Sequence, residues 1–128
     1  MKLLLDTCTF LWIVGDEPDL SDTARRLFSV QANEVYLSAV SSWEIAVKHR
    51  LGRLQLDKPP DEYVPHFRKK HFILPLSLEE QATLQLSKLP DHHRDPFDRM
   101  LICQALYHGL VLLTPDHEIR KYPVRCEW

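Results

Sequence analysis

Short apolar runs alternate with longer segments of helical periodicity along the whole chain. The runs are bounded by polar or turn residues, which is typical of buried strands in a parallel sheet. They fall at residues 3–5, 35–37, 72–74 and 110–113, with a shorter candidate at 124–128. Helices are predicted between them, at about 8–14, 21–30, 39–51, 61–71, 77–89 and 95–108. This order predicts an α/β fold, in which helices cover both faces of a central parallel sheet of four to five short strands.

Capping residues support several of these helix boundaries. The expected starts are Ser21, the capping box of Ser77 and Glu80, and Asp95 followed by Pro96. The expected ends are Gly52 and Gly109. Pro65 is expected to disturb the fourth helix. The side chains predicted to face the core from the last long helix are Leu101, Ile102, Ala105 and Leu106.

The composition is that of a soluble globular protein. With 128 residues, 45% of them hydrophobic and 27% charged, the chain is expected to form one domain over residues 1–128. Its three cysteines (Cys8, Cys103 and Cys126) form no CxxC pair, which favours a reducing cytoplasm and gives no zinc or disulfide pattern. No apolar run approaches the ~18 residues that span a membrane. We therefore expect a cytoplasmic protein without a membrane segment.

The net charge of −2 argues against a simple basic nucleic-acid binder. The charge is unevenly distributed, however. Between Lys48 and His71 there are seven lysine or arginine residues against three acids, a local balance of +4. This stretch is interpreted either as a solvated helical surface or as a patch that steers phosphate groups toward an acidic centre.

Four acidic residues stand where a parallel sheet places its ligands. Asp6 follows the first predicted strand directly, and Asp116 comes two residues after Thr114, where the fourth strand ends. Glu44 lies in the helix that leaves the second strand, and Asp98 lies in the first turn of the helix before the fourth. Because ligands of open α/β sheets bind beyond the carboxyl ends of the strands, we predict that these carboxylates converge there.

Three of the four acids also have a purely structural interpretation. Glu44 matches a capping box with Ser41, Asp98 suits the first turn of its helix, and Asp116 suits the start of a short helix that follows it. Asp6 differs, because a carboxylate that ends a buried, leucine-rich strand must find a partner. The conjunction of all four favours a shared site over separate structural roles.

Converging carboxylates repel one another unless a cation lies between them. Mg²⁺ or Mn²⁺ fits this arrangement, since both prefer oxygen ligands and the sequence offers no Cys/His set for zinc. A bound divalent cation can activate water and stabilise charge on a phosphate. The sequence contains no GxxxxGK[ST], GxGxxG or GxSxG motif, so nucleotide-triphosphate, dinucleotide and serine-hydrolase chemistry are disfavoured.

At this point the chain resembles a known family, the PIN-domain ribonucleases, and in particular the VapC toxins of type II toxin–antitoxin pairs. The resemblance covers almost the whole chain. It is carried by the segments Leu3-Leu4-Leu5-Asp6-Thr7, Ser38-Ala39-Val40-Ser41-Ser42-Trp43-Glu44-Ile45 with Lys48, His93-Arg94-Asp95-Pro96-Phe97-Asp98-Arg99 and Leu112-Leu113-Thr114-Pro115-Asp116. It implies a PIN-like three-layer fold and an endoribonuclease that depends on Mg²⁺ or Mn²⁺. It also implies a cognate antitoxin as partner and a homodimer.

By this resemblance the metal-binding and catalytic acids are Asp6, Glu44, Asp98 and Asp116. Thr7, Thr114 and Asp95 are expected to support them from close by. Two neighbours depart from the common pattern of the family: Cys8 stands where many relatives carry His, Asn or Ser, and Pro115 stands where many carry Ala. Both are adjacent to the site and are expected to alter its metal affinity.

The basic residues Lys48, Arg94 and Arg99 are weaker candidates for binding RNA phosphates. The three tryptophans (Trp12, Trp43 and Trp128) are interpreted as core or dimer anchors rather than as platforms for bases. The helix around Trp12 has more apolar surface than one buried face requires, which favours a homodimer.

Two other functions fit parts of the pattern. A metal-dependent phosphatase also places an Asp at the end of its first strand, but it needs a Lys near the last strand, which is not evident. A catalytically inactive PIN-like module that binds RNA or protein would be expected to lack one of the acids. All four acids are present.

Overall fold

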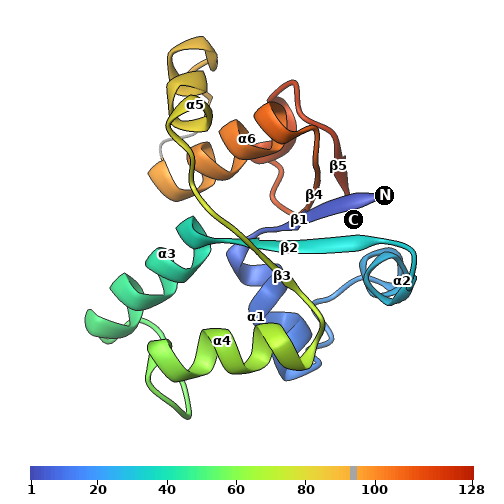
Figure 1. Cartoon of the computed structure of the whole chain (residues 1–128), viewed down its shortest axis with the longest axis vertical. Coiled ribbons are helices and arrows are strands. Elements are labelled where there is room, and N and C mark those ends of the chain that lie inside the picture. Colours follow the sequence, from blue (N-terminus) through green and yellow to red (C-terminus); the bar gives the residue numbers. More distant parts are fainter. Residues whose placement is uncertain (93–94) are drawn as a thin grey trace.

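A five-stranded parallel sheet organises the computed structural model of the chain, which describes residues 1–92 and 95–128 (Figure 1). Its strands are β1 (Lys2–Leu5), β2 (Glu34–Ser38), β3 (Leu74–Leu76), β4 (Val111–Leu113) and β5 (Cys126–Glu127). The spatial order is β3-β2-β1-β4-β5, and every neighbouring pair is parallel. The predicted α/β fold is therefore confirmed, with β1 at the centre of the sheet.

Helices lie on both sides of this sheet and complete three layers. They are α1 (Thr7–Gly15), α2 (Asp22–Ser29), α3 (Ala39–Arg50), α4 (Pro60–Lys70), α5 (Glu80–Thr83) and α6 (Pro96–His108), with short 3₁₀ turns η1 (Leu84–Lys88) and η2 (Ile119–Lys121). In Figure 1, α1, α2 and α4 lie on one side of the sheet, and α5 and α6 lie on the other. None of the helices in the described ranges is long and apolar enough to cross a membrane.

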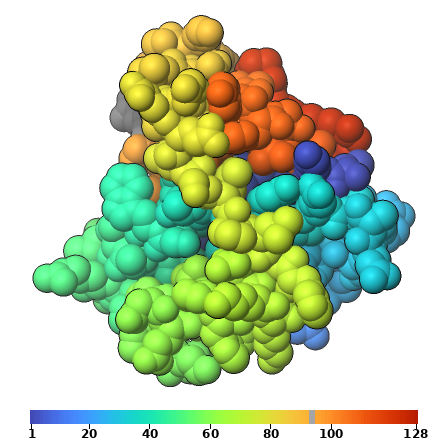
Figure 2. All heavy atoms as spheres, in the orientation of Figure 1, coloured from blue at the N-terminus to red at the C-terminus, as the bar shows by residue number. Residues whose placement is uncertain are grey.

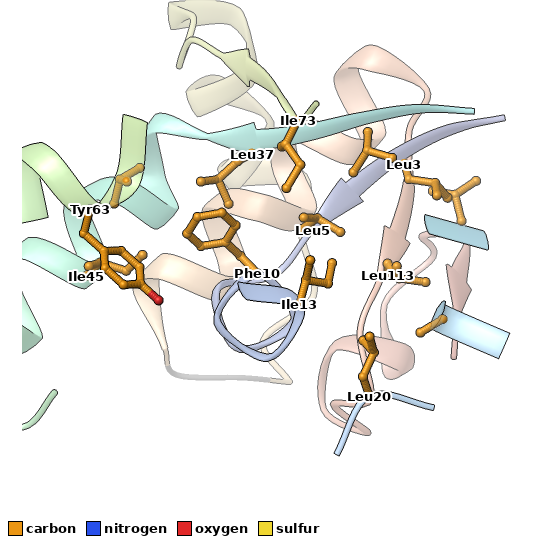
Figure 3. Close-up of a cluster of buried hydrophobic side chains, with 14 residues drawn as sticks. Leu3, Leu5, Phe10, Ile13, Leu20, Leu37, Ile45, Tyr63, Ile73 and Leu113 are labelled. Atoms are coloured by element: carbon orange, nitrogen blue, oxygen red, sulfur yellow. The ribbon is translucent and has the colours of Figure 1, made fainter. Parts of the chain in front are cut away.

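The alternation of side chains along β1 divides the interior into two cores. Leu3 and Leu5 face α1, α2 and α4, where they pack with Phe10 and Ile13 (Figure 3). Leu4 faces the opposite side and packs with the side chains of α6 and β4, among them Leu101, Ile102, Ala105 and Leu112. A run of three leucines thus fits a central strand that is covered on both faces.

Most predicted helix caps are confirmed. Ser21 accepts a hydrogen bond from the backbone N–H of Ala24, and Asp95 accepts from the N–H groups of Phe97 and Asp98. Gly52 and Gly109 both adopt the left-handed conformation, with φ of 71° and 67°, just after α3 and at the end of α6. Such positions suit glycine because it has no Cβ.

Two boundaries differ from the prediction. The third strand covers residues 74–76 rather than 72–74, because Phe72 lies in the turn after α4 with φ of 57°. The prediction that Ser77 and Glu80 form a capping box is wrong, since α5 begins after Glu79 without a side-chain cap. The carbonyl of Ser77 instead accepts a hydrogen bond from Gln104 Nε2.

Two predictions about single helix positions are also wrong. Helix α4 continues through Pro65, which lies inside it. Leu101, Ile102 and Ala105 are buried as predicted, but Leu106 is exposed, because it lies on the side of α6 that faces away from the core.

The three tryptophans are not equally buried. Trp12 and Trp128 are half-buried and pack against each other, with ring centroids 5.8 Å apart. The apolar surface around Trp12 is thus covered in part within one chain, which weakens that argument for a dimer. Trp43 is 57% exposed, so its assignment to the core of a single chain is wrong.

The basic stretch forms the end of α3, the following loop and α4. In Figure 2 residues 48–71, coloured from green to yellow-green, occupy the lower part of the molecule. The Nζ atoms of Lys58 and Lys70 both lie 5.7 Å from the ring centroid of Phe67. The basic stretch therefore lies at one end of the fold and includes the last turn of α3, the helix that carries Glu44.

Candidate active site

Asp6 occupies the centre of the site because β1 and β4 are neighbours. Leu5 pairs with Leu113, so the residues that follow them, Asp6 and Thr114, emerge side by side at the carboxyl edge of the sheet. The Thr114 hydroxyl donates to Asp6 Oδ2 at 2.5 Å. The other carboxylate oxygen accepts from the backbone N–H of Thr9 at 2.8 Å, which makes Asp6 the N-cap of α1. The strand-ending carboxylate thus has the partners that its burial requires.

Glu44 reaches the same edge from α3. Its helix begins after the N-cap Ser38, so the alternative reading of Ser41 and Glu44 as a capping box is wrong. Glu44 is only 4% exposed. The Thr7 hydroxyl donates to Glu44 Oε1 at 2.6 Å, and Lys48, one helical turn later, forms an ion pair with Oε2. Thr7 therefore links the carboxylate of α3 to the start of α1.

Asp95 and Asp98 are positioned by the start of α6. Asp95 is the N-cap, Pro96 occupies the first helical position, and Asp98 lies in the first turn. A carboxylate in this position is favoured in its charged form by the positive end of the helix dipole. The predicted structural role of Asp95 as a cap is confirmed by its two hydrogen bonds.

Asp116 follows β4 and is tied back to the same threonine. Its backbone N–H donates to the Thr114 hydroxyl at 3.1 Å, and its carboxylate accepts from the N–H of Glu118 at 2.9 Å. Thr114 therefore connects Asp116 with Asp6. The short helix expected at 116–121 is reduced to the 3₁₀ turn η2.

The four predicted acids line one cleft of about 320 Å³. The other residues that line it are Thr7, Cys8, Trp12, Lys48, Asp95 and Pro115. The carboxylates come from the end of β1, the middle of α3, the start of α6 and the loop after β4. The structure thus brings together groups that lie up to 110 positions apart in the sequence (116 − 6).

The electrostatics of the cleft reflect this gathering of negative charge. Burial raises the pKa of Asp6, hydrogen bonds from Thr114 and Thr9 oppose the rise, and the charge of Asp116 adds to it. The pKa of Cys8 is raised to about 11, first by burial and then by the charges of Asp6 and Glu44. Cys8 is therefore a protonated thiol at neutral pH, not an activated nucleophile.

The residues of the cleft fit a hard divalent cation by their chemistry. Carboxylate and hydroxyl oxygens dominate the lining, Cys8 supplies a single sulfur atom, and no histidine takes part. Within residues 1–92 and 95–128, however, no three His, Cys, Asp or Glu side chains are already placed to share one ion. Glu44, for example, is held by Lys48 and Thr7.

The three predicted phosphate-binding residues have different positions. Lys48 lines the cleft, where it neutralises Glu44. Arg99 is not among the lining residues, and its guanidinium donates to Asp91 at 2.6 Å. Arg94 lies outside the described residues.

Sequence reasoning missed three contributors to the site. The backbone N–H of Thr9 donates to Oδ1 of the N-cap Asp6, and the Thr9 hydroxyl donates to the carbonyl of Leu113 at 3.0 Å. Ser41 Oγ lies 3.0 Å from the Thr7 hydroxyl. Trp12 forms part of the cleft wall. The spacing Asp6-x-x-Thr9 is a cap signal that could have identified Thr9.

The geometry and the sequence agree on the family. A family model of the PIN domain matches residues 3–124, and the chain therefore belongs to the PIN domain family, as the resemblance predicted. It is 35% identical over 110 residues to Ribonuclease VapC16 of Mycobacterium tuberculosis. That match covers 84% of this chain and 72% of the relative.

Solved structures show the same fold. VapBC2 from Rickettsia felis, bound to a DNA fragment from its promoter, superimposes with a TM-score of 0.75 and 12% identity and covers 99% of this chain and 98% of that one. DNA-bound VapBC from Salmonella typhimurium superimposes with a TM-score of 0.69 and 18% identity, with coverage of 99% and 97%. At such low identity these likenesses establish the fold alone.

Proposed function

We propose that this chain is a metal-dependent endoribonuclease that hydrolyses RNA phosphodiester bonds and acts as the toxin of a toxin–antitoxin pair. The observation that carries this proposal is the convergence of Asp6, Glu44, Asp98 and Asp116 on one cleft. Membership of the PIN domain family and the identity with Ribonuclease VapC16 support it.

The four acids would hold Mg²⁺ or Mn²⁺, which when bound supplies activated water and neutralises charge on the phosphate. The chain's own groups prepare this site. Thr114 fixes one oxygen of Asp6, and Thr7 fixes one oxygen of Glu44. Lys48 balances the charge of Glu44 and presents a cation at the cleft, where an incoming phosphate needs one.

The two alternative functions receive less support. The cleft contains all four acids, whereas an inactive RNA- or protein-binding module has no need of them. A phosphatase would need a Lys from near the last strand beside the acids, whereas Lys48, the lysine that lines the cleft, comes from α3 and pairs with Glu44.

We also propose a cognate antitoxin, a homodimer and a cytoplasmic location. The solved VapBC structures with the same fold support the antitoxin, and the three free cysteines suit a reducing compartment. Because the cleft is acidic, we expect the antitoxin to present Arg or Lys toward Asp6 and Asp98, in competition with the metal. Raising Mn²⁺ should then weaken inhibition, and sedimentation at micromolar concentration tests the dimer.

The test of the activity uses purified protein and labelled RNA. We expect cleavage with Mg²⁺ or Mn²⁺, none with EDTA, and none with the Asp98→Asn variant. Asp57→Asn serves as the matched control, because Asp57 is exposed and is not among the residues that line the cleft. Cleavage that persists in EDTA, or that Asp98→Asn leaves unchanged, contradicts the proposal.

A further inference from the structure

Lys48 is the one basic side chain among the described residues that line the acidic cleft. The acids that line it are Asp6, Glu44, Asp95, Asp98 and Asp116. The Lys48 ammonium forms an ion pair with Oε2 of Glu44, which lies one helical turn earlier on α3. A glutamate four residues before a lysine is the favourable order for such a pair on a helix. The sequence of α3 therefore gives one acid of the cleft a cation of its own.

Burial makes this ion pair important for Glu44. The residue is only 4% exposed, and a carboxylate removed from water needs compensation for its charge. Its Oε1 accepts a hydrogen bond from the Thr7 hydroxyl at 2.6 Å, which is a neutral donor. The positive charge that offsets Glu44 comes from Lys48, whose side chain remains 42% exposed. The acid of this pair is thus fixed inside the fold, whereas its lysine can move outward into solvent.

Asp6 is compensated in a different way. Both of its oxygens accept hydrogen bonds from neutral groups, the backbone N–H of Thr9 and the Thr114 hydroxyl. Burial raises the pKa of Asp6, and the charge of Asp116 adds to that rise. A divalent cation would therefore add a counter-charge at Asp6. At Glu44 the same cation would have to take the place of an ammonium group.

The two cations cannot share Glu44 without cost. If both were in contact with its carboxylate, they would lie within a few ångström of each other and repel strongly in a buried site. Lys48 can give way, because a lysine carries a compact, well-hydrated charge on a flexible stem. Its exposed side chain gives the ammonium direct access to water. Exchange of the two cations at Glu44 therefore needs only a change of side-chain rotamer.

We propose that Lys48 is an internal competitor of the metal at Glu44, so that the cleft binds a divalent cation less tightly than its four acids alone would. The proposal rests on the metal-dependent function above and adds a means by which the chain limits its own metal loading. Lys48 is a positioning residue in this role, because it acts on the metal through Glu44.

The test measures Mn²⁺ binding by titration calorimetry, without RNA, in a double-mutant cycle of Lys48→Met and Glu44→Gln. Methionine removes the charge and keeps much of the apolar stem, and glutamine can still accept from Thr7. Arg50→Met is the matched control, because Arg50 is an exposed cation on the same helix and is not among the lining residues. Urea unfolding in EDTA establishes that each variant is folded. If Lys48→Met is not, Lys48→Gln takes its place in the cycle, since it keeps a donor for Glu44.

We expect Lys48→Met to bind Mn²⁺ roughly 5-fold more tightly than wild type, the upper end for loss of an ion pair with an exposed partner. In the Glu44→Gln background the same substitution should change the Kd by less than about 2-fold, because the carboxylate for which the cations compete is gone. Arg50→Met should leave the Kd unchanged. Lys48→Arg keeps the charge and should bind Mn²⁺ no more tightly than wild type.

Two results overturn the competition: an unchanged Kd in Lys48→Met, or an equal gain in affinity with and without the Glu44 carboxylate. The second would reduce Lys48 to a general positive charge near the cleft. Absence of Mn²⁺ binding in every form of the protein would instead overturn the metal-dependent function itself. If wild type bound Mn²⁺ but did not cleave RNA, the ribonuclease function would fail, and the cycle would still decide the competition.

Discussion

The substitution Asp6→Asn tests most directly whether the acids share a cation. Asp6 lies at the junction of β1 and β4, is only 5% exposed, and lines the cleft together with the other three acids. Asparagine keeps the size of the side chain and can still accept from Thr9, but it lacks the negative charge. The fold should therefore survive while the affinity for Mn²⁺ falls.

The size of the effect follows from binding linkage. At Mn²⁺ about 100-fold above its Kd, wild type gains about 2.7 kcal/mol of stability. A chain of 128 residues has an unfolding entropy near 0.27 kcal/mol/K, at about 2.1 cal/mol/K per residue, so its Tm should rise by about 10 °C. If Asp6→Asn weakens binding about 100-fold, the gain at the same Mn²⁺ concentration falls to about 0.4 kcal/mol, or roughly 1.5 °C.

Calorimetry or dye-monitored melting in metal-free buffer, followed by a Mn²⁺ titration, measures both quantities. The exposed Asp57→Asn variant should behave as wild type does. An equal rise in Tm for wild type and Asp6→Asn would refute the shared site, and so would the absence of any rise in wild type at millimolar Mn²⁺.

Three further predictions separate caps, ligands and packing. Asp95→Ala should lower the free energy of unfolding by about 0.5–2 kcal/mol, because α6 loses its N-cap. Asp98→Asn should abolish RNA cleavage and leave the metal-free protein folded. The reverse pattern in urea unfolding and RNA assays would contradict both roles. Because burial raises the pKa of Asp6, the folded state holds the proton of this carboxyl group more tightly than the unfolded state does. The protonated carboxyl group therefore contributes fully to the free energy of unfolding below the unfolded pKa of about 4. That contribution is lost as the pH rises through the folded pKa. In EDTA, Asp6→Asn should therefore be more stable than wild type at neutral pH and lose that advantage in acid; urea midpoints that differ by a constant amount at every pH would speak against this. Gln104→Met should lower the free energy of unfolding by about 1–3 kcal/mol, because the fully buried Ser38 hydroxyl loses the amide oxygen that accepts its hydrogen bond at 2.5 Å. In a double-mutant cycle, a Ser38→Ala background should remove part of that loss.

The parts of the fold that could be predicted from sequence are those where one local rule acts alone. The leucines of β1 are buried on both faces, and the acid after them must then lie at the carboxyl edge. The N-cap Asp95 and the terminal Gly109 fix the ends of α6 in the same direct way. These elements position Asp6 and Asp98, and so the acid cluster could be predicted in outline.

The remaining features depend on tertiary contacts that periodicity cannot reveal. Phe72 is apolar and begins an apolar run, but it occupies the left-handed position after α4, where its N–H bonds to Lys69 and that of Ile73 bonds to Arg68. Such a left-handed turn usually contains glycine, and the sequence has Phe72 there instead. Nothing in the sequence therefore indicated that β3 begins at residue 74. The hydrogen bonds of Gln104 to Ser38 and Ser77 join residues far apart in the sequence, so no local sequence pattern predicts them.

The register between β1 and β4 has a consequence for how the protein is made. The pairing of Leu5 with Leu113 sets Asp6 beside Thr114, and Asp116 follows two residues later. A ribosome synthesises Asp6 before Asp116, and α3 and α6, which carry the other two acids, are synthesised between them. An incomplete nascent chain therefore has no complete cleft, whatever helices it has already formed. The complete acidic cleft can therefore form only after Asp116 has been synthesised and β4 has paired with β1.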